Sequence, residues 1–154
     1  MTPDERIAEL GIELPVPSPP AGKYVPAVRT GNLVFVSGAG PIRPEGGGAV
    51  VGKVGRDLDI DEARAAARLV GLQILGTLRA ELGSLAAVTR VVKTLGMVNC
   101  APGFNRTPQV IDGCSELLIE VFGEAGRGAR SAVGMAELPF DIAVEIEVIV
   151  EVAG

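Results

Sequence analysis

The strongest structural constraint in this 154-residue chain is a strict alternation near its C-terminal end. Every second position between residues 143 and 152 is aliphatic: Val144, Ile146, Val148, Val150 and Val152. Because successive side chains of a strand point to opposite faces, these residues must cover a hydrophobic core. Glu145, Glu147 and Glu151 then share the other face with Ile149. A solvated sheet face is the simplest interpretation of these carboxylates, and a chemical role for one of them is the alternative.

Periodic patterns place the remaining elements. Apolar side chains at helical spacing predict long helices over residues 59–82 and 108–122, each followed by a glycine. Strands are expected at residues 24–29, 33–37, 88–98, 129–137 and 143–152, with a short one near 49–54. This order predicts an α+β fold in which a mixed sheet carries both long helices on one face.

The first twenty residues are expected to precede a single domain that spans residues 21–154. Thr2-Pro3-Asp4-Glu5 has the pattern of a capping box with proline at the first helical position, which predicts a short N-terminal helix. The proline-rich stretch 15–20 should keep the following segment extended. We therefore expect a helix that docks on the domain through a stiff connector.

The chain contains no histidine. That absence excludes imidazole as a general base or metal ligand, and with it the Ser-His-Asp and Cys-His arrangements and the usual zinc sites. Proton chemistry would have to use carboxylates, water, backbone groups or the single tyrosine, Tyr24.

The net charge and the composition argue against nucleic acids and membranes as partners. The net charge is −5 and aromatic residues make up only 3% of the chain, so neither a basic footprint nor stacking platforms for nucleic acid are visible. No apolar run is long enough to span a membrane, and the N-terminus lacks the features of a signal peptide. Cys100 and Cys114 form no CxxC pair. We expect a cytoplasmic, reduced protein that binds neither nucleic acid nor membrane.

Four acidic residues at the start of the first long helix have a faint likeness to a calcium-binding loop: Asp57, Asp59, Asp61 and Glu62. The loop glycine and the terminal glutamate of such a site are not correctly spaced here. Acidic residues are favoured at a helix N-terminus, which explains this group without a metal.

Arg130 is a candidate binding residue because its strand face is otherwise free of bulky side chains. It alternates with Ala132, Gly134 and Ala136, which leaves room for a small ligand or a neighbouring subunit. The planar guanidinium suits carboxylates because it can form two parallel charge-assisted hydrogen bonds. A structural ion pair between Arg130 and Glu145 or Glu147 is the alternative.

The C-terminal motifs resemble those of the YjgF/RidA family. The resemblance rests on Ala129-Arg130-Ser131-Ala132-Val133, Leu138-Pro139 and Val144-Glu145-Ile146-Glu147, and extends to Gly22-Lys23-Tyr24-Val25-Pro26 and Phe35-Val36-Ser37-Gly38. It covers roughly residues 21–152, and the N-terminal extension is typical of a longer subgroup. It implies a chorismate mutase-like fold of the bacillus type, assembled as a homotrimeric barrel with clefts between subunits.

The resemblance also implies an activity. Family members hydrolyse reactive 2-imino and enamine acids to 2-keto acids and ammonia, without a metal or organic cofactor. Arg130 matches the arginine that binds the substrate carboxylate, and Glu145 matches the glutamate that positions the hydrolytic water. A non-catalytic module that binds small carboxylates is the alternative function, and ribonuclease activity, attributed to some relatives, is a weaker one.

Five more residues match positions that line the family's cleft. Tyr24, Ser37 and Gly38 agree with the family pattern, with Gly38 presenting its backbone to the ligand. Ala132 stands where studied members have cysteine or threonine, so only its backbone could contribute. Asp112 falls near a pocket asparagine, where its charge could repel an anionic substrate unless the side chain points away.

Overall fold

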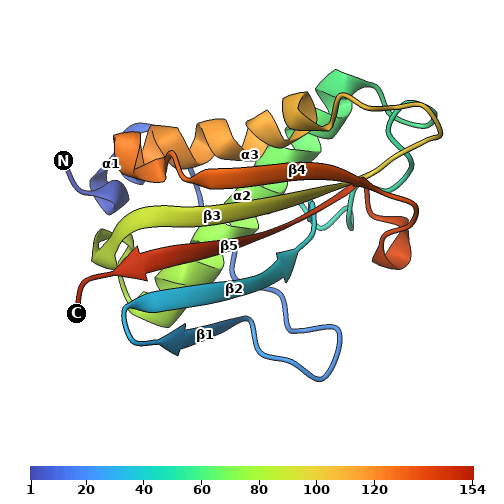
Figure 1. Ribbon diagram of the computed structural model, residues 1–154. Helices are drawn as coiled ribbons and strands as arrows, with labels where there is room; N and C mark the ends of the chain where they lie inside the picture. Colours follow the sequence, from blue (N-terminus) through green and yellow to red (C-terminus); the bar gives the residue numbers. More distant parts are fainter.

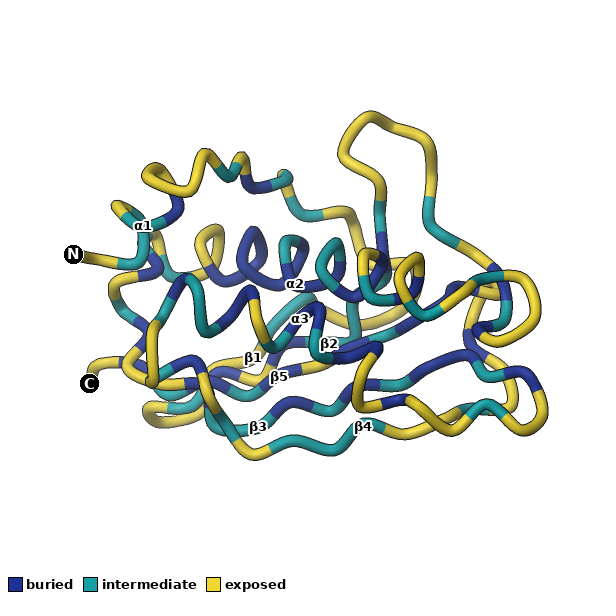
Figure 2. Tube along the Cα trace, turned by 90° about the horizontal axis from the view of Figure 1, so that it is seen from above, coloured by how far each residue is buried: buried dark blue, intermediate teal, exposed yellow.

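The computed structural model describes all 154 residues and arranges them in three layers. A five-stranded sheet forms one layer, the long helices α2 and α3 lie together on one face of it, and the N-terminal segment covers the helices from outside (Figures 1 and 2). Both long helices therefore share one face of the sheet, as the order of elements predicts. The other face of the sheet carries no helix.

The sheet has the strand order β1-β2-β5-β3-β4. Its strands are β1 (Ala27–Thr30), β2 (Leu33–Ala39), β3 (Val88–Asn99), β4 (Ala129–Met135) and β5 (Val144–Val152). Only β3 and β4 pair in parallel, so the sheet is mixed. The short turn η3 (Pro139–Asp141) joins β4 and β5, yet β3 lies between them. This placement separates two strands that are consecutive in the chain.

The core lies between the sheet and the helices. The predicted aliphatic face of β5 is buried in it, with each of the five side chains at most 2% exposed. Helix α2 (Ile60–Leu82) begins at Asp59, whose side chain accepts from the Glu62 backbone N–H, and ends at Gly83 in the left-handed conformation. Helix α3 (Thr107–Phe122) has proline in its first turn.

Helices α2 and α3 approach each other closely at two glycines. A methyl group at Gly71 would stand 2.8 Å from Leu117 Cδ2, and one at Gly113 would overlap the backbone carbonyl of Arg64. Because these two positions have no side chain, the two helices can pack at this short distance.

The predicted N-terminal helix is present as α1 (Pro3–Glu9), with the capping box between Thr2 and Glu5. It packs against α3, where Arg6 Nε donates to the Glu120 carbonyl at 3.1 Å. The segment after it has no regular structure, and the Pro15 carbonyl lies directly over Gly76 of α2. The connector is therefore an ordered outer layer on the helices.

Some predicted boundaries were wrong. The expected strand near 49–54 is absent, because only isolated bridges form there. The buried Asn99 side chain holds this loop instead: its Nδ2 donates to the Gly52 carbonyl at 3.4 Å, and its Oδ1 accepts from Lys53 Nζ at 2.8 Å. Strand β1 starts at Ala27 rather than at residue 24, and β4 ends at Met135 rather than at 137. None of the helices combines the length and the apolar character needed to cross a membrane.

Candidate functional site

An irregularity in β2 brings Gly38 against Glu145. Between the pairs Val36–Val148 and Ala39–Ile146, β2 contains one residue more than β5, so the strand bulges at Ser37 and Gly38. A methyl group added at Gly38 would overlap the Glu145 carboxylate and lie 3.0 Å from its Cδ. Glycine at this position leaves the space that the Glu145 carboxylate occupies, and a Cβ would displace it.

Glu145 is a half-buried carboxylate without a cationic partner. None of the ion pairs in the structure includes it. Burial, and to a lesser degree the like charge of Glu147, raises the pKa of its carboxyl group. A carboxyl group whose pKa is raised toward neutrality is suited to exchanging a proton with water.

Ser37 adjoins Gly38 in the bulge, and Tyr24 comes directly before the residue that Ser37 binds. Ser37 Oγ donates to the Val25 carbonyl at 2.6 Å, which fixes the segment after Tyr24 beside the bulge. The Tyr24 side chain is half exposed, and its hydroxyl accepts from the Ala21 backbone N–H at 3.3 Å. We call Tyr24, Ser37, Gly38 and Glu145 the β2–β5 cluster.

Arg130 is held by α3. Its Nη1 donates to Asp112 Oδ1 at 2.6 Å and to Ser115 Oγ at 3.2 Å, and only Nη1 is used in these bonds. Asp112 therefore points toward the guanidinium, and Nε and Nη2 remain available to a ligand. Neither partner is deeply buried, because the side chains of Arg130 and Asp112 are 26% and 40% exposed.

Ala132 lies on the same face of β4 as Arg130 and is hydrogen-bonded to the start of α3. Its carbonyl accepts from Thr107 Oγ1 at 2.9 Å, so this strand segment is fixed to the helix. We call Asp112, Ser115, Arg130 and Ala132 the β4–α3 cluster.

The two clusters lie on opposite faces of the sheet. In the strand register, Arg130 of β4 lies opposite Thr94 of β3, and Thr94 lies opposite Val148 of β5. Residues opposite one another point to the same face, and Val148 is in the core, so the Arg130 side chain lies on the helix side. Glu145 is paired with Met97 in an alternate row and lies on the open side. The alternative of an ion pair between Arg130 and Glu145 or Glu147 is therefore wrong. Within one chain, the sequence-predicted residues assemble as two separate groups.

Each cluster borders its own cavity. One of about 640 Å³ lies between α3 and the start of β4 and is lined by Asp112, Ser115 and Arg130. Another of about 370 Å³ lies on the open face of the sheet and includes Ser37 and Glu147. Both cavities are open to the surface, and neither connects Arg130 with Glu145.

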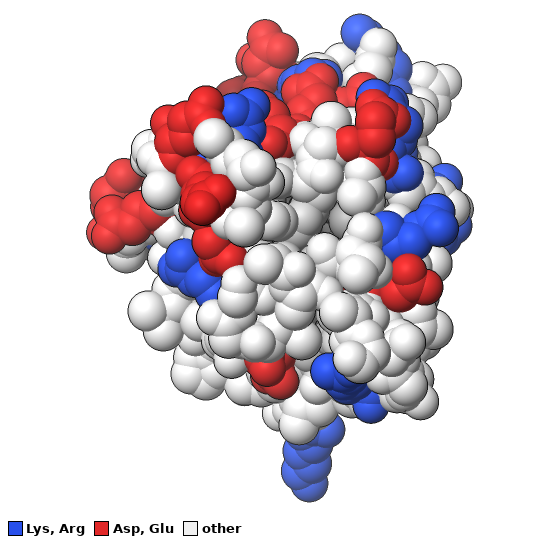
Figure 3. All heavy atoms as spheres, turned by 90° about the vertical axis from the view of Figure 1, so that its left-hand side faces the viewer, with Lys and Arg blue, Asp and Glu red and all other residues white.

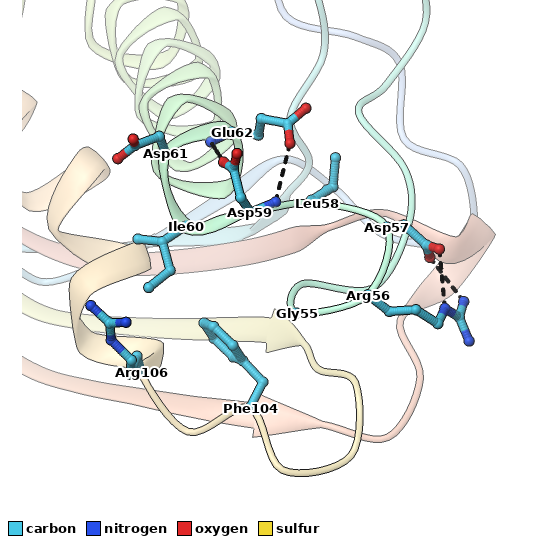
Figure 4. Close-up of a pocket in the computed structure, with 10 residues that line it drawn as sticks. All are labelled: Gly55, Arg56, Asp57, Leu58, Asp59, Ile60, Asp61, Glu62, Phe104 and Arg106. Atoms are coloured by element: carbon cyan, nitrogen blue, oxygen red, sulfur yellow. Dashed lines mark hydrogen bonds and ion pairs between the residues drawn. The ribbon is translucent and has the colours of Figure 1, made fainter.

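A larger cavity, about 740 Å³, lies at the start of α2 and contains none of the sequence-predicted site residues (Figure 4). Three of the four acidic residues that line it are engaged locally: Asp57 pairs with Arg56, and Asp59 and Glu62 cap the helix. Hydrogen bonding from Arg56 lowers the pKa of Asp57 to about 2. No group of three potential metal ligands occurs in the chain. The interpretation of these acidic residues as helix-terminal groups is consistent with this geometry.

Residues 4–152 match the family described as YjgF/chorismate mutase-like, putative endoribonuclease. The chain belongs to this family. Its resemblance to YjgF/RidA proteins and its chorismate mutase-like fold are thereby confirmed. The match begins within α1 and so includes the N-terminal segment.

Individual relatives cover nearly the whole chain. Protein TCP17 of Trypanosoma cruzi is 44% identical over 94% of this chain and 91% of its own. The crystal structure of Atu1372 from Agrobacterium tumefaciens, a protein of unknown function, is 45% identical, covers 98% of this chain and 92% of that one, and has a TM-score of 0.87. A putative endoribonuclease from Shewanella oneidensis is 30% identical over 99% and 100% of the two chains, with a TM-score of 0.94.

A more distant structure of the same fold is E. coli TdcF with bound serine. It is 26% identical over 91% of this chain and 94% of that one, with a TM-score of 0.62.

Two residues of the site were given no role in it from the sequence: Ser115 was not considered, and Glu147 was considered only as a strand-face neighbour of Glu145 and a possible ion-pair partner of Arg130. Ser115 is one turn after Asp112 on α3 and so shares its helix face, which is a signal that spacing alone could have supplied. Glu147 shares the strand face of Glu145, and its charge raises the pKa of that neighbour. The pairing of Asp112 with Arg130 had no such signal, because it depends on how α3 packs against β4.

Proposed function

We propose that this protein hydrolyses reactive 2-imino acids to 2-keto acids and ammonia, without a cofactor, at clefts between copies of the chain. The observation that carries the proposal is the half-buried, unpaired carboxylate of Glu145, held over Gly38 with a raised pKa. Membership of a family that includes RidA supports it.

In the proposed complex, Arg130 binds the substrate carboxylate through Nε and Nη2, the nitrogens that Asp112 and Ser115 leave free. Fixing the carboxylate orients the imine carbon and removes much of the entropic cost of the encounter. Because Arg130 and Glu145 lie on opposite faces of one sheet, the two would meet only if neighbouring copies contribute one each.

Glu145 would act on water in two steps. As the water oxygen adds to the carbon of the protonated imine, the C=N electron pair moves to nitrogen and Glu145 accepts a proton from the water. Glu145 then returns this proton to the nitrogen of the carbinolamine. The C–N bond breaks, ammonia leaves with its electron pair, and the hydroxyl gives its proton to Glu145 as the O–H electrons form the C=O bond. The raised pKa of Glu145 suits both the acceptance and the return of the proton.

Assembly of copies is supported by the open face of the sheet. Val28, Phe35 and Val133 are 54%, 42% and 39% exposed there, and the face carries no helix. Large exposed apolar side chains of this kind are typical of interfaces. We propose that this face is covered by further copies in a homotrimer.

A coupled assay tests the activity. The protein is added to an amino-acid oxidase or a PLP-dependent dehydratase, and the release of 2-keto acid is followed. Arg130→Ala should lower kcat/KM by about 100-fold or more, because the charge-assisted contacts to the substrate are lost. Since the pair with Asp112 is partly exposed, the variant should remain folded, which circular dichroism checks. A folded Arg130→Ala protein with full activity would disprove the proposal.

Glu145→Gln separates catalysis from mere binding. If the protein is a deaminase, this variant loses turnover and still binds small carboxylates. If no substrate is accelerated by the unmodified protein but ligands bind, the binding module is the better description.

Ribonuclease activity is the second candidate, because the family description and the Shewanella oneidensis relative carry the word endoribonuclease. The charges on one face of the molecule do not favour it. On the face that carries both chain ends, acidic side chains gather near α1 and the end of α3 and no basic stripe is seen (Figure 3). Cleavage of RNA with a steep salt dependence would support the ribonuclease over the deaminase.

A further inference from the structure

Every charged side chain around the Arg130 cavity has a partner of opposite sign. Four ion pairs account for them: Arg130–Asp112 at 2.6 Å, Arg127–Glu124 at 3.2 Å, Arg68–Glu120 at 3.2 Å and Arg64–Glu116. The cavity therefore has no surplus positive charge. A simple anion entering it gains the attraction of Arg130 and meets the repulsion of Asp112 at nearly the same distance.

Asp112 differs from the other acidic residues of this cavity. Glu116 and Glu120 are bound by arginines of α2, on the helix surface. Asp112 instead is bound to the guanidinium that faces the cavity, and its side chain is 40% exposed. A ligand held on Nε and Nη2 of Arg130 would thus find a carboxylate beside its own.

We propose that Asp112 makes this site selective for ligands that carry a positively charged nitrogen next to the carboxylate, such as α-amino acids and protonated 2-imino acids. The ligand carboxylate binds Arg130, and the cationic nitrogen donates to Asp112. Each charged group of the ligand then contacts a protein group of opposite charge. An anion without the nitrogen instead places its carboxylate near that of Asp112, and the two repel each other.

This inference deepens the proposed function and rests on the same Arg130 site. It also has a chemical consequence. A carboxylate beside the imine nitrogen favours the protonated iminium, which is more electrophilic than the neutral imine. Asp112 would therefore select the reactive form of the substrate as well as its class.

Calorimetric titration with two ligands of the same shape tests the selectivity. L-serine carries an ammonium group where L-glycerate carries a hydroxyl, and neither is turned over by hydrolysis of an imine. The protein should bind L-serine about tenfold more tightly than L-glycerate, the scale of one hydrogen bond between charged groups. In Asp112→Asn the ratio should fall to near one, mainly because L-glycerate binds more tightly.

Glu116→Gln is the matched control. It removes a carboxylate from the lining of the same cavity but not the one bound to Arg130, so the serine-to-glycerate ratio should stay near its original value. The proposal is overturned if the unmodified protein binds L-glycerate as tightly as L-serine, if it binds neither, or if Asp112→Asn keeps the ratio. A role of Asp112 in merely orienting Arg130 predicts that both ligands weaken together in Asp112→Asn, which also overturns it.

The outcome is separable from that of the proposed activity. If the ratio behaves as expected while the coupled assay shows no turnover with any substrate, the selectivity stands and the deaminase does not. If turnover is found but the ratio does not depend on Asp112, only the present inference falls.

Discussion

The charged groups of the two clusters lie in opposite kinds of environment. In the β4–α3 cluster, Arg130 is paired with Asp112 and lies at the edge of the sheet, beside an open cavity. In the β2–β5 cluster, Glu145 is half-buried, has no cation beside it and has a raised pKa. A paired charge at an edge suits recognition, whereas an unpaired one that has lost part of its hydration suits proton exchange.

The difference indicates a division of labour that neither cluster could perform alone. The register of the sheet keeps Arg130 and Glu145 on opposite faces, and no movement of a side chain can bring them together. A site that needs both must be completed by a second copy. The three predictions that follow test this division, beginning with the largest expected effect.

Mixing two inactive variants gives the largest effect. Arg130→Ala and Glu145→Gln should each lose about 100-fold or more in kcat/KM. If the halves come from different copies, a mixed oligomer contains interfaces in which both halves are intact, roughly one in three for a mixed trimer. Co-expression with two different tags, followed by purification on both, should therefore recover about a third of the original activity. Doubly tagged oligomers of a single variant serve as the control, and mixed oligomers that stay inactive would show that the halves do not combine across copies.

Substituting Gly38 should give an intermediate effect on the β2–β5 cluster. In Gly38→Ala the new methyl group occupies the space of the Glu145 carboxylate, and because that side chain is flexible it should swing away. We expect kcat/KM to fall by about 10- to 100-fold through misplacement of the carboxylate, with a loss of about 1 kcal/mol in the free energy of unfolding.

Gly40→Ala is a close control two residues away. Its methyl group would stand 3.5 Å from Ile142 Cδ1, an ordinary contact, so activity and stability should change little. Ligand binding at Arg130 should survive both substitutions. An active Gly38→Ala protein would show that the position of Glu145 over the bulge has no role in turnover.

Local signals in the chain predict its elements well. The capping box at Thr2, the glycine that ends the helix at residue 82 and the alternation of β5 appear in the structure as expected, because each depends on neighbours within a few residues. The short strand near 49–54 was wrong for the opposite reason. The loop that replaces it is held by Asn99, a buried side chain nearly fifty residues away.

In the candidate site, too, the sequence predicts local features but not the contacts between distant segments. Motifs identify Arg130 and Glu145, but their separation depends on the placement of β3 between β4 and β5, which is a long-range pairing. The contact between Asp112 and Arg130 likewise depends on α3 lying close to β4, and motif spacing left open which way Asp112 points.

The smallest expected effect is the dependence of stability on pH that Glu145 introduces. Its pKa in the folded state is raised above the value of an unfolded chain, so in the interval between the two values the folded state binds more protons. Glu145 therefore contributes nothing unfavourable in acid, and its cost to stability appears as the pH rises above the ordinary glutamate range. The free energy of unfolding of Glu145→Gln relative to the unmodified protein, from urea titrations, should increase across that interval and level off above the raised pKa.

Glu147→Gln gives a graded version of the same measurement. Burial is the larger cause of the shift and the Glu147 charge the smaller, so removing that charge should reduce the pH dependence without abolishing it. Arg130→Ala should affect it only through a neighbouring copy, since within its own chain Arg130 is paired on the other face of the sheet. Because the register of the sheet keeps the two groups apart within one chain, a pH dependence that changes in Arg130→Ala would report their contact across copies.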